Sequence, residues 1–228
     1  MTIQDNLRQI QLQIAAACAR AGRDPASVRL VAVAKLKPAS LIEEAAAAGQ
    51  RLFGESYVQE FTAKAEQVRS AVEWHFIGAL QTNKVKYLRG KVRLIHSVDR
   101  LSLAQEIDRQ WRRQGAIADI LLQVNLGEEE SKSGTEEAAL VDLARQVAQL
   151  PNLRIRGLMT LPPWFEVAEE VRPFFRRLRQ LAEELQRLAI PGVDMAELSM
   201  GMSHDFEIAI EEGATLVRVG TAIFGQRE

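Results

Sequence analysis

The feature that most constrains this chain is the regular alternation of short apolar segments with longer amphipathic ones. Eight apolar segments predict strands, at residues 28–35, 51–54, 73–78, 92–98, 117–126, 153–160, 196–200 and 214–219. A segment with helical periodicity or helix-capping residues follows each of the first seven. Strict alternation of this kind predicts an α/β fold with parallel strands and right-handed crossovers.

Eight such units in 228 residues match the strand number and approximate size of a (β/α)8 TIM-type barrel. We expect one domain over residues 1–228, because no linker or composition shift divides the chain. No helix is expected after the eighth strand, and an extra N-terminal helix is predicted to cover that gap. An open doubly wound sheet is the alternative. It requires a glycine-rich turn after the first strand, whereas Ala34-Lys35-Leu36-Lys37 has no glycine.

Two of the predicted helices have distinctive signals. Ser40-Leu41-Ile42-Glu43 has the form of a capping box, which predicts a helix beginning at Ser40. The helix after the sixth strand has the clearest periodicity in the chain. Its predicted buried face comprises Phe174, Leu178, Leu181, Leu185 and Leu188.

Composition argues against several partners. The net charge of −1 creates no basic field for nucleic acid, and no apolar run approaches the ~20 residues that span a bilayer. The polar N-terminus, with Gln4 and Asp5, is unlike a secretory signal. The single cysteine, Cys18, fits a reducing compartment and a buried position. We therefore expect a cytoplasmic protein.

Two glycine turns with hydroxyl residues follow the seventh and eighth strands. The first contains Ser199, Gly201 and Ser203, and the second contains Gly220 and Thr221. Barrels commonly bind phosphate with the loops after these two strands, through backbone N–H groups and hydroxyls. The alternative is that both glycines only permit tight turns. Two adjacent loops of this composition favour phosphate.

Lys35 ends the first predicted strand. If the barrel closes, the last strand lies beside the first, and the amine is then next to the two glycine turns. A primary amine facing a phosphate site suggests a phosphorylated aldehyde held as a Schiff base. A solvated lysine is the alternative. Lys37 precedes Pro38, so we expect it to point along the loop.

Arg218 lies between Val217 and Val219 inside a predicted strand, where a charge needs a partner. It is predicted either to pair with a carboxylate such as Glu55 or to face a ring nitrogen or a phosphate. His75, His96 and His204 have no metal-ligand spacing, which predicts hydrogen-bonded histidines and no metal site. The run 128–134 predicts a polar loop.

Ordered motifs across nearly the whole chain resemble the pyridoxal phosphate homeostasis protein family. The motifs are Val33-Ala34-Lys35 with Lys37-Pro38, Phe53-Gly54-Glu55, Trp74-His75-Phe76-Ile77-Gly78, Gln81-Thr82-Asn83-Lys84, Ser131-Lys132-Ser133-Gly134, Arg156-Gly157-Leu158-Met159, Ser199-Met200-Gly201-Met202-Ser203 and Val217-Arg218-Val219-Gly220-Thr221-Ala222-Ile223-Phe224-Gly225.

The resemblance implies an alanine-racemase-like barrel that carries pyridoxal 5′-phosphate (PLP) as a Schiff base on Lys35. It also implies that Arg218 faces the pyridine nitrogen. The implied phosphate ligands are Ser199, Gly201, Gly220 and Thr221. Ser56 replaces the Asn that is usual in the family. An Asn at this position could hydrogen-bond the phenolic oxygen of PLP, and the serine side chain is shorter. The implied role is non-catalytic PLP homeostasis, with downstream effects on amino-acid metabolism. We expect a monomer, with PLP-dependent apo-enzymes as transient recipients.

A PLP-dependent racemase or decarboxylase is the alternative, and it needs the same lysine. Arg218 favours the carrier in part, because a permanent cation beside the pyridine nitrogen disfavours its protonation, although by resemblance racemases of this fold tolerate it. By resemblance, racemases of this fold add a second domain that supplies a tyrosine base. Tyr57 and Tyr87 are the only tyrosines here, and both lie in early segments. A pure interaction module remains a third interpretation if the chain binds no PLP.

Overall fold

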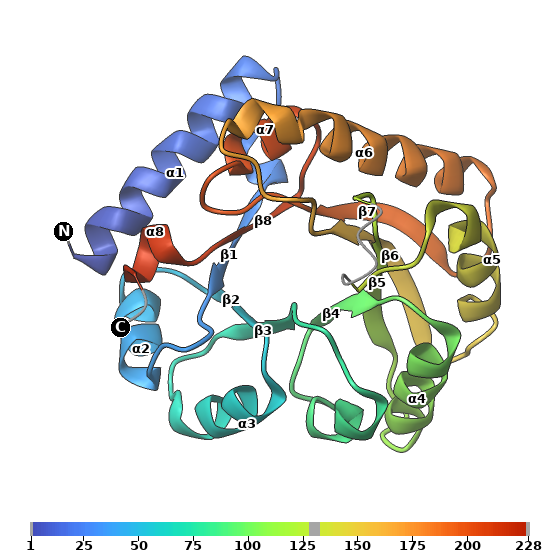
Figure 1. The fold of residues 1–228 in the computed structure, drawn as a ribbon. Coiled ribbons are helices and arrows are strands. Elements are labelled where there is room, and N and C mark those ends of the chain that lie inside the picture. Colours follow the sequence, from blue (N-terminus) through green and yellow to red (C-terminus); the bar gives the residue numbers. More distant parts are fainter. Residues whose placement is uncertain (1, 128–132, 227–228) are drawn as a thin grey trace.

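A computed structural model of the chain describes residues 2–127 and 133–226. All eight strands form a closed parallel barrel in chain order, in which β8 pairs with β1 (Figure 1). This closure confirms the predicted (β/α)8 barrel and excludes an open sheet, where β1 and β8 would not meet. Of the polar loop predicted at 128–134, residues 128–132 lie outside the described residues.

The strands and helices alternate as the sequence predicts. The strands are β1 (Arg29–Val33), β2 (Leu52–Glu55), β3 (Glu73–Phe76), β4 (Leu94–Val98), β5 (Ala118–Val124), β6 (Leu153–Thr160), β7 (Val193–Ser199) and β8 (Leu216–Val219). The α-helices are α1 (Ile3–Arg20), α2 (Ala39–Ala47), α3 (Val58–Gln67), α4 (Leu101–Arg112), α5 (Glu137–Val147), α6 (Arg172–Arg187), α7 (Phe206–Glu211) and α8 (Thr221–Phe224). The segment after β3 is a 3-10 helix, Thr82–Tyr87, in place of the expected α-helix.

The last barrel unit is completed by helices from both ends of the chain. A four-residue helix, α8, follows β8, so the expectation that no helix follows the last strand was wrong. The N-terminal helix α1 packs against α7 and α8, as predicted, and Asn6 Nδ2 donates to the Ile223 carbonyl at 2.9 Å. Pairing of the two ends thus fixes the β8–α8 loop beside the start of the chain.

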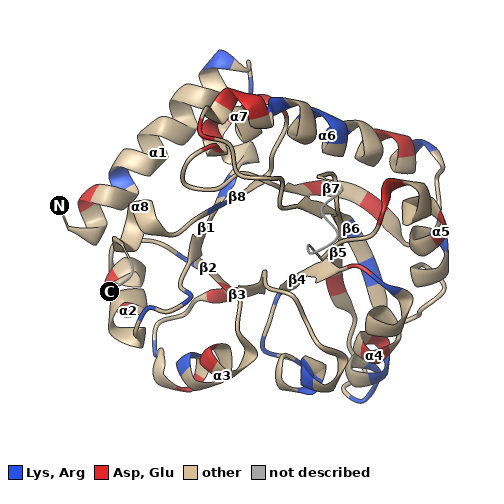
Figure 2. Ribbon diagram, in the orientation of Figure 1, with Lys and Arg blue, Asp and Glu red and all other residues tan. Residues whose placement is uncertain are grey.

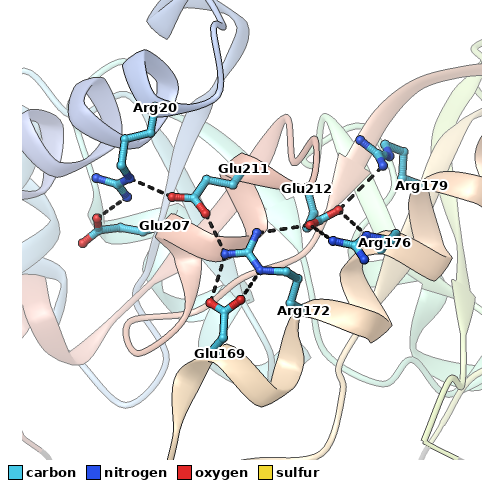
Figure 3. A network of polar contacts seen from close by, with 8 residues as sticks. All are labelled: Arg20, Glu169, Arg172, Arg176, Arg179, Glu207, Glu211 and Glu212. Carbon is cyan, nitrogen blue, oxygen red and sulfur yellow. Dashed lines mark hydrogen bonds and ion pairs between the residues drawn. The ribbon is translucent and has the colours of Figure 1, made fainter.

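A network of four arginines and four glutamates joins α1 and α7 to α6 and the 3-10 helix before it, Ala168–Val171 (Figure 3). Arg172 of α6 is central, since it contacts Glu169, Glu211 and Glu212. The other members are Arg20, Arg176, Arg179 and Glu207. Glu211 of α7 contacts both Arg20 of α1 and Arg172 of α6, which ties α1 to the outer layer of the barrel.

The core has two apolar layers. One fills the inside of the barrel with Val31, Leu52, Leu94, Leu121, Met159 and Leu216. The other lies between the strands and the surrounding helices, and Cys18 is fully buried there, as predicted. Figure 2 shows that charged residues cover the outer helices and also occur within β5, β6, β7 and β8. The strands therefore carry charged residues as well as the apolar residues of the two layers.

Two local predictions were wrong. No capping box forms at Ser40, because α2 begins earlier, after Pro38, and Glu43 instead accepts hydrogen bonds from Arg69 and Ser70. In α6 the fully buried aromatic residue is Phe175 and not Phe174, and Leu188 lies past the end of the helix, 45% exposed. Tertiary contacts decided both positions.

Candidate functional site

The C-terminal ends of the strands, which we call the mouth, bring Lys35 toward the β8–α8 loop. In the register of β1 and β8, Ala32 lies opposite Val219. One residue further, a Cβ on Gly220 would lie 3.3 Å from Val33 Cβ. The two backbone segments are therefore in close contact where β1 and β8 end. This is the closing contact that the sequence predicted, and it places the Lys35 turn next to Gly220 and Thr221.

Lys35 lies two residues beyond β1, in a tight turn. The Lys37 N–H donates to the Ala34 carbonyl at 3.1 Å, and Leu36 has a φ of 59°. A positive φ is unfavourable for a leucine and persists only where surrounding contacts impose it. Two side chains do so here: Glu60 Oε2 accepts from the Leu36 N–H at 2.8 Å, and Lys64 Nζ donates to the Ala34 carbonyl at 2.7 Å. The backbone on both sides of Lys35 is therefore held in place.

Lys64, on α3, is the centre of this support, and sequence reasoning missed it. Its Nζ also contacts Glu55 Oε1 at 2.6 Å and Glu60 Oε2 at 2.9 Å, and the side chain is 9% exposed. Burial raises the pKa of Glu55 even though the hydrogen bond from Lys64 acts to lower it. The only sequence signal was a lysine four residues after Glu60 on a helix.

Arg218 enters the barrel interior from β8 and is 3% exposed. Its Nη1 donates to Ser199 Oγ at 2.5 Å and its Nη2 to the Thr160 carbonyl at 2.9 Å. The predicted alternative of an ion pair with Glu55 is wrong, because Glu55 pairs with Lys64. Burial lowers the pKa of Arg218 to about 10, with the charge of Asp205 opposing the shift. A buried cation held by two neutral acceptors keeps its positive charge available for a ligand.

Ser199 is fully buried, and its hydroxyl lies within a chain of polar side chains inside the barrel. Besides Arg218, it contacts His96 Nδ1 at 2.9 Å, and His96 Nε2 lies 2.9 Å from His75 Nδ1. The hydrogen bonds of Ser199 thus connect it to Arg218 and His96 inside the barrel, whereas the sequence predicted that its hydroxyl binds phosphate. His96 has partners on both ring nitrogens, as expected, but His75 Nε2 has none among the described residues.

The hydroxyls nearest the β8–α8 loop are those of Ser203 and Thr221. The Gly220 N–H lies 3.4 Å from Ser203 Oγ, and Thr221 Oγ1 lies 3.3 Å from the same atom. Both contacts are longer than the usual hydrogen bond. Three polar groups thus converge with weak mutual bonds, which an anion could replace at little cost. Ser203, which the sequence placed in the same glycine turn as Ser199, is the serine that contacts Gly220 and Thr221.

Gly201 is explained by packing. Its φ is +89°, and a Cβ at this position would lie 2.6 Å from Ala209 Cβ on α7. Its carbonyl accepts from the Arg218 N–H at 3.0 Å. The tight-turn interpretation therefore accounts for Gly201, and the loop that it shapes holds Ser203 beside Gly220.

Two other kinds of feature are absent from the residues that the structure describes. No group of three potential metal ligands among histidine, cysteine, aspartate and glutamate comes together there. Within the same ranges, no helix combines the length and apolar character that a membrane span requires.

Comparison with known proteins places the chain. The alanine racemase N-terminal domain family matches residues 5–228. The pyridoxal phosphate homeostasis protein of Aquifex aeolicus (strain VF5) is 48% identical over 229 residues, covering 100% of both chains. PipY of Synechococcus elongatus PCC7942, in a structure with PLP bound, is 39% identical with a TM-score of 0.86, covering 98% of this chain and 100% of PipY.

A crystal structure of an unknown protein from Bifidobacterium adolescentis is similar as well. It is 38% identical with a TM-score of 0.92, covering 97% of this chain and 94% of that one. Sequence identity of 48% over the full length of a relative, together with a shared barrel, leads to one conclusion. The chain belongs to the pyridoxal phosphate homeostasis protein family, within the alanine racemase N-terminal domain family.

Proposed function

We propose that this protein binds PLP at its mouth, covalently through Lys35, and serves PLP homeostasis without catalysing a reaction of its own. The observation that carries the proposal is the turn at Lys35. A strained backbone, held by Glu60 and Lys64, presents a primary amine beside a loop of phosphate-binding character. The PLP bound in the structure of PipY supports the same assignment.

The groups at the mouth fit PLP in charge and donor type. The Ser203 and Thr221 hydroxyls and the Gly220 N–H would hold the phosphate, in loops where the contacts between these groups are long. Arg218 would face the ring nitrogen. Ser199 would act indirectly by fixing Arg218, and Gly201 by shaping the loop. PLP supplies an aldehyde that condenses reversibly with a primary amine and a ring that withdraws electrons when its nitrogen is protonated.

Arg218 is the reason for proposing a carrier over an enzyme. Its guanidinium keeps its charge, since even the lowered pKa of about 10 lies well above neutrality. A cation at that position opposes protonation of the ring nitrogen and so weakens the ring as an electron sink, although racemases of this fold tolerate such a cation and add a tyrosine base from a second domain. The name of the Aquifex relative, a homeostasis protein, agrees with this proposal. We further propose that the protein works as a cytoplasmic monomer that releases PLP to apo-enzymes.

The test measures turnover and transfer on the PLP-loaded protein. Solvent-deuterium incorporation and racemisation are followed with a panel of L- and D-amino acids, and PLP transfer is followed by activation of a PLP-dependent apo-enzyme. We expect no preferred amino acid and activation of the apo-enzyme. Turnover above about 1 s⁻¹, the low end of typical enzyme rates, with one preferred amino acid would overturn the carrier assignment.

A further inference from the structure

The opposite end of the barrel, which we call the base, contains a second polar cavity. It has a volume of about 260 Å³ and opens at the N-terminal ends of the strands. Four arginines and two carboxylates line it, together with a leucine and a histidine: Arg29, Arg93, Arg154, Arg156, Asp119, Glu197, Leu94 and His75. None of these residues belongs to the mouth. The volume is below the ~300–1,000 Å³ typical of organic ligand pockets, which favours a small ligand.

The cavity has an excess of positive charge. Three of its arginines are each paired with a carboxylate: Arg29 with Glu197, Arg154 with Asp119 at 2.7 Å and Arg156 with Asp194 at 2.6 Å. Arg93 precedes β4 and has no carboxylate within ion-pair distance among the described residues. One guanidinium in the cavity thus keeps its full set of N–H donors for a ligand.

His75 supplies a second, independent indication. Arg218 can only donate, so Ser199 Oγ accepts from it, and the only acceptor described for the Ser199 proton is His96 Nδ1. A neutral His96 must then carry its proton on Nε2 and donate to His75 Nδ1. A neutral His75 therefore carries its own proton on Nε2. That atom is buried, has no partner among the described residues, and belongs to a side chain that lines the cavity.

We propose that the base cavity binds a small phosphate-bearing anion, with Arg93 as its main cation and the His75 Nε2–H as a buried donor. Burial, with Arg29 and Arg93 nearby, lowers the pKa of His75 to about 3, so the ring contributes a neutral N–H and adds no charge. An N–H donor surrounded by guanidinium groups is best satisfied by an anionic oxygen. A guanidinium also matches the oxygens of a phosphate with two parallel hydrogen bonds.

Calorimetric titration with inorganic phosphate at constant ionic strength tests the site. PLP-loaded protein is used so that the mouth is occupied. We expect one saturable site that becomes at least tenfold weaker in Arg93→Gln and unchanged in Arg113→Gln, which removes an exposed arginine elsewhere. Failure of wild type to bind phosphate saturably, or equal binding by wild type and Arg93→Gln, would overturn the proposal. The difference in phosphate affinity between wild type and Arg93→Gln is informative even if the chain binds no PLP. Failure of this proposal can therefore be distinguished from failure of the proposed function.

Two further measurements sharpen the assignment. Nitrogen-15 NMR of labelled histidines should show His75 and His96 as neutral Nε2–H tautomers, and phosphate should shift the His75 Nε2 signal but not that of His204. A His75 proton on Nδ1 would contradict the donor assignment. Tighter binding of glycerol phosphate than of inorganic phosphate would identify an organic phosphate as the ligand, and the reverse would identify the free ion.

Discussion

The two ends of this barrel hold positive charge in opposite ways. At the base, Arg154 pairs with Asp119, and most of the other arginines also have carboxylate partners. At the mouth, Arg218 is held by a hydroxyl and a carbonyl, and the lysine that holds the Lys35 turn takes up the nearby carboxylate charge. A cation paired with a carboxylate orders the structure, whereas a cation fixed by neutral groups keeps its charge for a ligand. We therefore propose that the mouth binds an anion, and that among the described residues of the base Arg93 and His75 have the same capacity.

The largest expected effect comes from removing the support under the mouth. Lys64→Met leaves Glu55 and Glu60 as uncompensated carboxylates, one of them fully buried, and should lower the free energy of unfolding by about 3–5 kcal/mol. Urea unfolding measures the change. Lys91→Met, at an exposed position, is the control and should change stability by less than about 0.5 kcal/mol. If Lys64→Met costs no more than Lys91→Met, the turn is not held as described.

The hydrogen-bonded side chains that run from the mouth to the base, Arg218, Ser199, His96 and His75, predict a loss of stability in mild acid. The folded protein keeps His75 neutral because its pKa is lowered to about 3, whereas the unfolded chain binds a proton near pH 6.5. The His75 contribution to stability is thus fully present well above pH 6.5 and falls as the pH is lowered, by about 1.6 kcal/mol between pH 6.5 and pH 5.

Urea unfolding at pH 6.5 and pH 5 checks this expectation. His75→Asn should lose about 1.6 kcal/mol less over the interval than wild type does. His204→Asn, which removes an exposed histidine, should keep the wild-type dependence. The same dependence in His75→Asn and wild type would mean that His75 is protonated in the folded state.

Single hydroxyls at the mouth should separate phosphate binding from support of Arg218. Ser203→Ala and Thr221→Ala should each weaken PLP binding by roughly tenfold, about 1.4 kcal/mol, and leave pyridoxal binding unchanged. Ser199→Ala should weaken both compounds equally, because its hydroxyl holds Arg218. Fluorescence titration gives the affinities. A larger effect of Ser199→Ala on PLP than on pyridoxal would return Ser199 to the phosphate site.

The smallest expected effect is at a base ion pair. Asp119→Asn breaks the contact with Arg154, whose side chain is 48% exposed, and should cost less than about 1 kcal/mol of stability. The same change removes a negative charge from the cavity, so phosphate should bind more tightly. Thermal unfolding and calorimetry measure the two quantities. Weaker phosphate binding in Asp119→Asn would contradict the anion site.

The sequence predicted the parts that depend on local pattern and topology. Alternation predicted the barrel, and closure of β1 on β8 placed Lys35 beside Gly220. Choices between nearby residues were beyond it, because packing in three dimensions decides them. Ser199 and Ser203 are equally plausible phosphate ligands in a motif, and only the alternation of side chains along β7 turns Ser199 into the barrel toward His96.

Long-range pairing was equally inaccessible. Glu55 was a reasonable partner for Arg218 in the sequence, yet Lys64 takes that carboxylate. The hydrogen bonds that set the tautomers of His75 and His96 have no sequence signature, and neither has the unpartnered His75 Nε2. Both features arise because side chains from β3, β4, β7 and β8 meet inside the barrel.

Borohydride reduction of the PLP-loaded protein followed by peptide mapping tests the central claim most directly. Lys35 should carry the reduced adduct, and Lys35→Ala should lose both the adduct and the absorbance band of bound PLP. Lys37→Ala should keep both, because Lys37 Nζ donates to the Gln226 carbonyl at 2.9 Å. An adduct on Lys37, or an undiminished band in Lys35→Ala, would contradict the account.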